Sequence, residues 1–120
     1  MQYLGLYTPS VRTDGPPAPE HMQAMGNLVG EMMASGKLLH TAPLGRRETG
    51  GMRISLNGGK LDVTENPQGE SVLLSANGFA LLQADSKEEL TANIRRFLET
   101  AGDGSVEILA LAEMPGAPAA

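Results

Sequence analysis

The chain has 120 residues and a formal net charge of -5, with 14 acidic residues, no cysteine and two histidines. An acidic chain of this length forms one domain and lacks the basic face that nucleic acids and anionic membranes bind, so we expect neither as a partner. Without cysteine there are no disulfides and no thiolate chemistry, and we expect no metal and no cofactor. The chain has neither the signature of a signal peptide nor a membrane-spanning run, which is typical of a soluble cytoplasmic protein.

The first third of the chain predicts a strand and then a helix. Residues 2–8 are apolar on both faces apart from Gln2, so we expect a strand covered on both sides. A proline-rich loop containing the turn sequence Asp14-Gly15-Pro16 leads to a helix that starts at Pro19 and ends at Gly36. A methionine-rich face on this helix is compatible with a peptide groove, but we interpret it as core. This face consists of Met22, Met25, Val29, Met32 and Met33.

The middle of the chain predicts a second strand, residues 37–44, and then a β-hairpin. Apolar and polar residues alternate in 52–56 and 60–64, on either side of Asn57-Gly58-Gly59, which indicates two half-buried strands around a tight turn. A two-residue turn at Asn57-Gly58 places every apolar side chain of the hairpin on one face. The expected facing pairs are Leu56 with Gly59, Ile54 with Leu61 and Met52 with Val63.

The last third predicts strand, helix and strand. Residues 78–84 are almost continuously apolar, as expected of a central strand. Ser86 and Glu89 form a capping box in which both side chains accept from backbone N–H groups, and the helix runs to Gly102. Residues 106–112 form a last strand, and the tail, 113–120, is expected to be disordered.

The order of these elements predicts the fold class and a partner. Strand, helix and strand occur twice around the hairpin, which is the α+β, ferredoxin-like split βαβ pattern with an inserted β-hairpin and helices on one face of the sheet. The central strands are apolar on both sides, so the face without helices needs a cover. A second copy of the chain is the simplest cover, and we expect a homodimer.

Several segments together resemble the YCII-related family, in its DGPF branch. The resemblance implies a dimeric α+β barrel, with residues 1–112 as the YCII-related domain, a cleft beside the inserted hairpin, and a largely unassigned activity. Where the family has Asp-Gly-Pro-Phe, this chain has Glu65-Asn66-Pro67-Gln68. The segments are Met1-Gln2-Tyr3-Leu4, Pro17 to Met22, Asn57 to Thr64, Gly78-Phe79-Ala80, Ser86 to Glu89, Arg95 to Leu98 and Ala101 to Gly104.

The resemblance and the residue types suggest two catalytic candidates. In related proteins a histidine near the position of His21 is proposed to act with an aspartate, and Glu65 could orient it or accept a proton itself. The alternatives are a partly exposed first-turn histidine and a solvated turn glutamate. His40 matches no family motif.

The candidate ligand-binding residues are Arg53, Asn66, Pro67 and Tyr3. Arg53 aligns with a family arginine, and with Arg46 and Arg47 it could hold a small anionic ligand through charge-assisted hydrogen bonds. Arg53 could equally be the polar face of the hairpin, with the other two arginines in a solvated loop. Two functions stay open: a homodimeric small-molecule-binding or accessory protein, and a small lyase, isomerase or hydrolase that uses His21 with Glu65 as an acid/base pair.

Overall fold

The computed structural model describes residues 1–11 and 17–112, so the Asp14-Gly15-Pro16 turn and the tail lie outside the described residues. Every strand and long helix expected from the sequence is present, and two short elements, the 3-10 helix η1 and the helix α2, were not predicted. The elements in chain order are β1 (Gln2–Pro9), α1 (Pro19–Ala34), β2 (Leu38–Pro43), η1 (Arg47–Thr49), β3 (Met52–Asn57), β4 (Lys60–Glu65), α2 (Val72–Ser75), β5 (Gly78–Gln83), α3 (Lys87–Ala101) and β6 (Gly104–Ala110).

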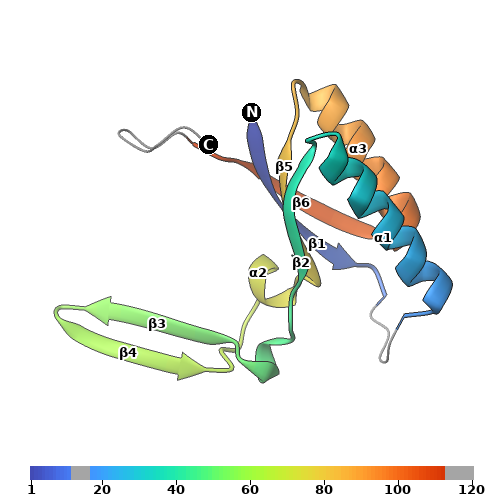
Figure 1. Ribbon diagram of the computed structural model, residues 1–120. Helices are drawn as coiled ribbons and strands as arrows, with labels where there is room; N and C mark the ends of the chain where they lie inside the picture. The colour runs from blue at the N-terminus through green and yellow to red at the C-terminus, as the bar shows by residue number, and fades with distance from the viewer. Residues whose placement is uncertain (12–16, 113–120) are drawn as a thin grey trace.

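Four strands form an antiparallel sheet, and the hairpin stands apart from it. The strand order is β2-β5-β1-β6, and β3 pairs only with β4 in a second, two-stranded sheet. The long helices α1 and α3 lie side by side on one face of the four-stranded sheet (Figure 1). The predicted α+β class is confirmed.

The core lies between this sheet and the two helices. Side chains of β1 alternate, so Tyr3 and Tyr7 point toward the helices while Leu4 and Leu6 point to the opposite face. Seven buried residues form one cluster near the end of α1 and the start of α3. They are Tyr3, Leu28, Met32, Leu38, Leu82, Ala84 and Leu90.

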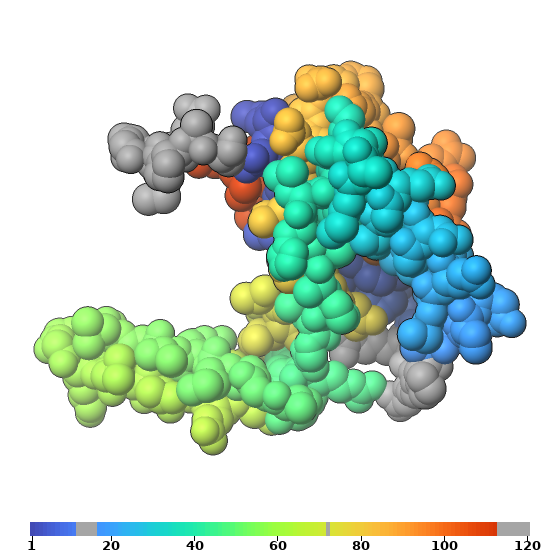
Figure 2. Space-filling view, viewed as in Figure 1, coloured from blue at the N-terminus to red at the C-terminus, as the bar shows by residue number. Residues whose placement is uncertain are grey.

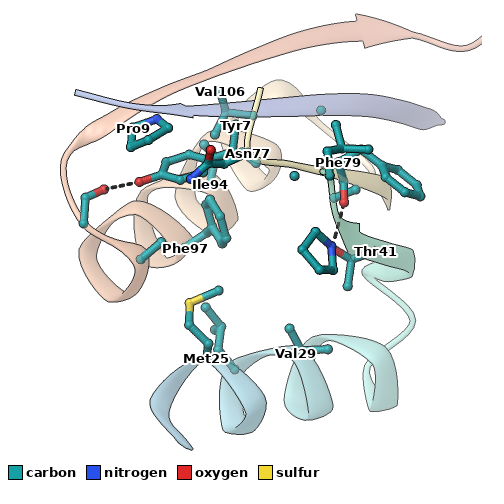
Figure 3. A pocket seen from close by; sticks show the side chains of 18 of the residues that line it. Tyr7, Pro9, Met25, Val29, Thr41, Asn77, Phe79, Ile94, Phe97 and Val106 are labelled. Atoms are coloured by element: carbon teal, nitrogen blue, oxygen red, sulfur yellow. Dashed lines mark hydrogen bonds between the residues drawn. The ribbon is translucent and has the colours of Figure 1, made fainter. Parts of the chain in front are cut away.

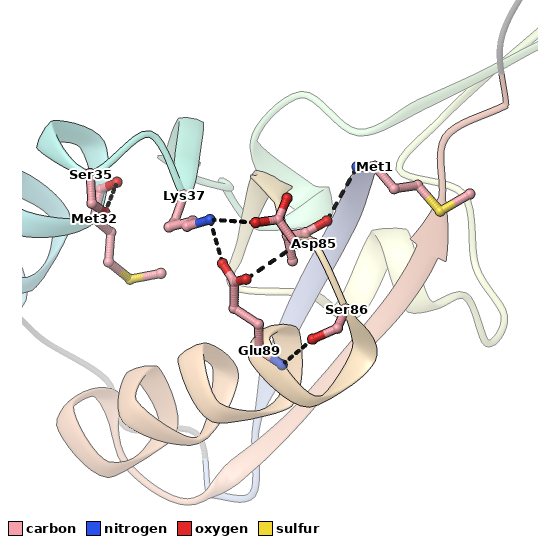
Figure 4. Close-up of polar contacts among 8 residues, drawn as sticks. Met1, Met32, Ser35, Lys37, Asp85, Ser86 and Glu89 are labelled. Atoms are coloured by element: carbon pink, nitrogen blue, oxygen red, sulfur yellow. Dashed lines mark hydrogen bonds and ion pairs between the residues drawn. The ribbon is translucent and has the colours of Figure 1, made fainter.

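A polar network ties Lys37, the residue before β2, to the start of α3 at this end of the sheet (Figure 4). The Lys37 ammonium lies 2.5 Å from Oε1 of Glu89 and 3.7 Å from Oδ2 of Asp85. The Ser86 hydroxyl accepts from the backbone N–H of Glu89, as the capping box predicts. The Glu89 carboxylate accepts from the backbone N–H of Asp85 at 3.3 Å, rather than from that of the cap residue Ser86. The hydrogen bond from Lys37 lowers the pKa of Glu89 below its usual value.

The register of the hairpin differs from the prediction. The two turn residues are Gly58 and Gly59, with φ of 57° and 83°, and Asn57 pairs with Lys60. The predicted Asn57-Gly58 turn is therefore wrong. The turn forms at Gly58-Gly59 because two positive φ angles are least strained where both residues lack a Cβ. The register moves by two residues, which keeps each side chain on its predicted face. The observed apolar pairs are Ile54 with Val63 and Leu56 with Leu61.

The molecule is more extended than a compact chain of its length. Its radius of gyration is 16.5 Å, whereas a compact domain of this size has about 14 Å. The hairpin causes much of this extension: it reaches away from the sheet on the side opposite α1 and α3, and a recess lies between it and the rest of the chain (Figures 1 and 2). The sheet face on that side carries Leu109, which is 69% exposed.

Candidate ligand-binding cavity

A cavity of about 1080 Å³ lies between the helices and the sheet, beyond the buried core. Leu28, Met32 and Leu82 of the buried core form one wall of the cavity, and the space extends from them toward the other end of the sheet. Met25 and Val29 of α1 face Phe97 and Ile94 of α3 and the side chains of the sheet across this space (Figure 3). The cavity is therefore lined mainly by apolar side chains, as small-molecule sites usually are.

Three small residues of the two central strands form part of the sheet side of the cavity. Gly5 of β1 pairs with Ala80 of β5, and Tyr7 pairs with Gly78; all four line the cavity. The Ile108 and Val106 side chains lie 3.2 Å from where a Cβ of Gly5 would be, so they occupy the space over this buried glycine. The sheet side of the cavity also carries the larger side chains of Tyr7, Phe79 and Leu82.

Tyr7 supplies a polar group to the cavity. Its ring meets Phe97 edge to face with centroids 5.1 Å apart, and its hydroxyl donates to the carbonyl oxygen of Gly102 at 3.3 Å. Burial raises the pKa of Tyr7 above 10.0, and the nearby Asp103 carboxylate raises it further. The phenol is therefore protonated at neutral pH and serves as a neutral hydrogen-bonding group rather than as a base.

Charged and polar residues line the exposed end of the cavity. His21 of α1 is partly buried there, while Arg46 and Asp103 are exposed. Two further groups come from the sheet and its connections: Thr41, whose hydroxyl donates to the carbonyl oxygen of Phe79 at 2.7 Å, and Asn77. An apolar interior with a few polar groups at one end suits a ligand that has an apolar body and a polar end.

Of the predicted catalytic and ligand-binding residues, His21 lines this cavity, and so does Arg46, which was named only as a possible companion of Arg53. Glu65 is exposed at the end of β4, and Arg53 is exposed on the polar face of β3. Tyr3 is buried in the core cluster, 8% exposed. Within one chain the structure therefore does not bring Glu65 or Arg53 into the cavity that His21 lines.

The segment that replaces the DGPF motif forms the base of the hairpin. The backbone N–H of Asn66 donates to the carbonyl oxygen of Gly51 at 2.8 Å, and Pro67 is fully buried. Nη1 of Arg47 donates to the carbonyl oxygens of Pro67 and Gly69, at 3.3 and 2.9 Å. Arg47 thus holds the hairpin base, and Asn66 and Pro67 belong to this joint.

Sequence reasoning missed most of the cavity residues. Tyr7, Thr41, Asn77 and Phe97 were not singled out, because a strand or helix pattern does not report a gap between layers. The available signal was the alternation of Gly5 and Tyr7 on the helix-facing side of β1. A small residue beside a large polar aromatic, opposite an apolar helix, is compatible with a lined cavity.

Within residues 1–11 and 17–112, no three His, Asp or Glu side chains come close enough together to hold a metal ion. Among the helices that the structure describes, none has the length and apolarity needed to cross a membrane.

Comparison with known proteins gives no assignment: no family model and no curated protein matches this chain. What the fold and the site define is a small α+β protein with an apolar cavity between its sheet and its helices.

Proposed function

We propose that this chain is a small-molecule-binding protein whose ligand has an apolar body and an anionic end. The observation that carries the proposal is the cavity of about 1080 Å³ between α1, α3 and the sheet. This volume is just above the range for drug-sized ligands, about 300 to 1000 Å³. Apolar side chains on both layers provide the surface that such a ligand would bury.

The anionic end is assigned from the charged residues at the exposed end of the cavity. Arg46 and His21 line it together with Asp103, and a guanidinium binds carboxylates and phosphates through charge-assisted hydrogen bonds. Arg46 therefore takes the role that sequence reasoning gave mainly to Arg53. The Tyr7 hydroxyl, which donates to the carbonyl oxygen of Gly102 beside Asp103, offers a neutral acceptor at this end.

Binding without chemistry fits these residues better than the alternative enzyme does. A lyase, isomerase or hydrolase that used His21 with Glu65 needs both side chains within hydrogen-bond reach of one substrate. In one chain Glu65 lies at the end of β4 and does not line the cavity of His21. We therefore place the binding function first.

We also propose that the fold is ferredoxin-like and that the chain is a YCII-related protein. The order β2-β5-β1-β6, antiparallel throughout, with the hairpin inserted between β2 and β5, supports the split βαβ assignment. Asn66 supports the alignment with the DGPF motif. It occupies the place of the motif's glycine and has φ of 47°, a left-handed conformation that glycine adopts freely and asparagine tolerates.

We propose that two copies pair through the open face of the sheet, as in a dimeric α+β barrel. Leu4 of β1 lies between Leu81 of β5 and Leu109 of β6, so three leucines form a row on this face. The chain exposes 8692 Å², whereas a compact monomer of its mass exposes about 6200 Å². The protruding hairpin adds to this excess (Figure 1), which is larger than the roughly 800 Å² that each partner buries in a stable interface.

The ligand proposal can be tested with two probes that differ only in charge. We expect 4-phenylbutyrate to bind about tenfold more tightly than 4-phenylbutan-1-ol, because Arg46 pairs with the carboxylate. Binding is followed by NMR shifts of the methyl groups of Met25 and Val29, which line the cavity. In Arg46→Met the two probes should bind equally.

Arg53→Met is the matched control, since Arg53 is an exposed arginine outside the cavity. It should leave both affinities unchanged. Failure of either probe to shift the cavity methyl groups at millimolar concentration would contradict the proposal. Equal loss of affinity for 4-phenylbutyrate in Arg46→Met and Arg53→Met would mean that the carboxylate does not bind specifically at Arg46, which would contradict the anionic end of the proposal.

A further inference from the structure

One face of the β3–β4 hairpin is apolar and exposed. Five side chains of this face are between 48% and 67% exposed. The opposite face carries polar and charged residues, among them Arg53, Ser55, Asp62 and Thr64. The apolar residues are Met52, Ile54, Leu56, Leu61 and Val63. A hairpin with two such different faces is built to pack against another surface on one side only.

The hairpin has little else to stabilise it. An isolated two-stranded hairpin is marginally stable in water, and soluble monomers rarely leave a continuous apolar patch of this kind uncovered. The Ile54–Val63 and Leu56–Leu61 pairs stabilise the hairpin, but their side chains remain exposed to water. The apolar face therefore requires a cover.

The base of the hairpin limits where that cover can come from. Arg47 donates to the carbonyl oxygens of Pro67 and Gly69, and Asn66 donates to that of Gly51. Pro67 is fully buried at this joint. These contacts fix the direction in which the hairpin leaves the sheet, so it does not fold back on its own chain without breaking them.

The hairpin leaves the sheet toward the side where the proposed second subunit would lie. The hairpin extends on the side of the sheet opposite α1 and α3, which is the side of the open face (Figure 1). Its strands of six residues reach about 20 Å, whereas stacked sheets lie about 10 Å apart. A second chain that covers the open face therefore lies alongside the hairpin. The hairpin is long enough to reach beyond the sheet of that second chain.

We propose that the apolar face of each hairpin packs on the partner subunit, so that the two hairpins clasp the dimer. This inference rests on the proposed homodimer and adds a second contact to it. A twofold axis makes the contact reciprocal, since each subunit gives one hairpin and receives one. The contact continues the interface at the open sheet face rather than forming a separate one.

Two neighbouring β-branched residues give a matched test. Val63 lies on the apolar face of β4, and Thr64 lies next to it on the polar face. Val63→Asp should raise the dimer Kd by about tenfold or more, because it places a carboxylate in the apolar contact. Thr64→Asp introduces the same charge one residue away and should leave Kd unchanged. Sedimentation velocity over a dilution series measures both.

The outcomes separate this inference from the proposed dimer. A monomeric wild-type protein would contradict both. A dimer that Leu109→Ser dissociates while Val63→Asp leaves it intact would keep the dimer and overturn the hairpin contact. Equal weakening by Val63→Asp and Thr64→Asp would also overturn it, since only one of the two faces is proposed to be covered.

A second measurement identifies the surface that the hairpin touches. Dimers are formed from one isotope-labelled and one unlabelled full-length chain, and filtered NOEs are recorded from the methyl groups of Ile54 and Leu56. NOEs to protons of the unlabelled chain are expected. NOEs only to protons of the labelled chain would mean that the hairpin packs on its own subunit, which would overturn the inference.

Discussion

Replacing Leu109 with serine tests the open face of the sheet directly. Fully burying a leucine side chain is worth about 1.5 to 3 kcal/mol. Leu109 is 69% exposed in one chain, so covering it on dimerisation contributes about 1 to 2 kcal/mol per subunit. A twofold interface contains the residue twice, so the loss is about 2 to 4 kcal/mol per dimer, or about 30- to 1000-fold in Kd.

The assay is sedimentation velocity of the wild-type protein and two variants over a concentration series. Met22→Ser is the control: Met22 is also an exposed apolar side chain, 58% exposed, but it lies on α1, on the other side of the sheet. It should not change Kd. The reasoning is refuted if Leu109→Ser and wild type dissociate alike, or if wild type sediments as one species near 12.6 kDa at micromolar concentration.

Two further predictions concern stability. Gly104→Ala should destabilise the protein by about 2 kcal/mol, because the new Cβ would lie 2.5 Å from the carbonyl oxygen of Thr8. Gly26→Ala, in open space on α1, should instead stabilise the protein by about 1 kcal/mol. Equal urea midpoints for the two variants would contradict the β1–β6 register. Lys37→Met should lower the melting temperature at neutral pH, and its difference from wild type should shrink as the pH falls below 4.5. Lys37 lowers the pKa of Glu89 in the folded state. The ion pair therefore stabilises the protein above the unfolded-state pKa of Glu89, and this stabilisation is lost as the pH falls through the folded-state pKa. A difference in melting temperature that stays constant from pH 7 to 3 would contradict this prediction.

The regular elements were predictable because their signals are local. The apolar run of residues 78–84 and the Ser86 cap each depend on a few neighbouring residues, and both occur in the structure as β5 and the start of α3. The four-residue helix α2 was missed, since four residues complete barely one helical turn and show no periodicity. The hairpin register failed by two residues because Asn57-Gly58 and Gly58-Gly59 are both acceptable turns, and backbone strain rather than side-chain pattern chose between them.

The Glu89 side of the capping box shows a similar limit. The sequence predicts that this carboxylate accepts from a backbone N–H before the helix, and it does so at Asp85. It also pairs with Lys37 of the segment before β2, 52 residues earlier in the chain. No local pattern reports a partner at that separation, so the role of Lys37 could be seen only once the sheet had brought the two together.

The candidate site was beyond prediction for a related physical reason. Periodicity shows which face of α1 is apolar, but not how far that face lies from the sheet. Leu28 and Met32 pack with Leu82 in the buried core and also form part of the cavity wall. Met25 and Val29, on the same helix, line the cavity as well and stay partly exposed. One apolar stripe thus contributes both to the core and to a cavity wall, and its periodicity is the same in either place. The size of the cavity depends on the distance between α1 and the sheet, and that distance depends on residues of other elements, which no local pattern of α1 contains.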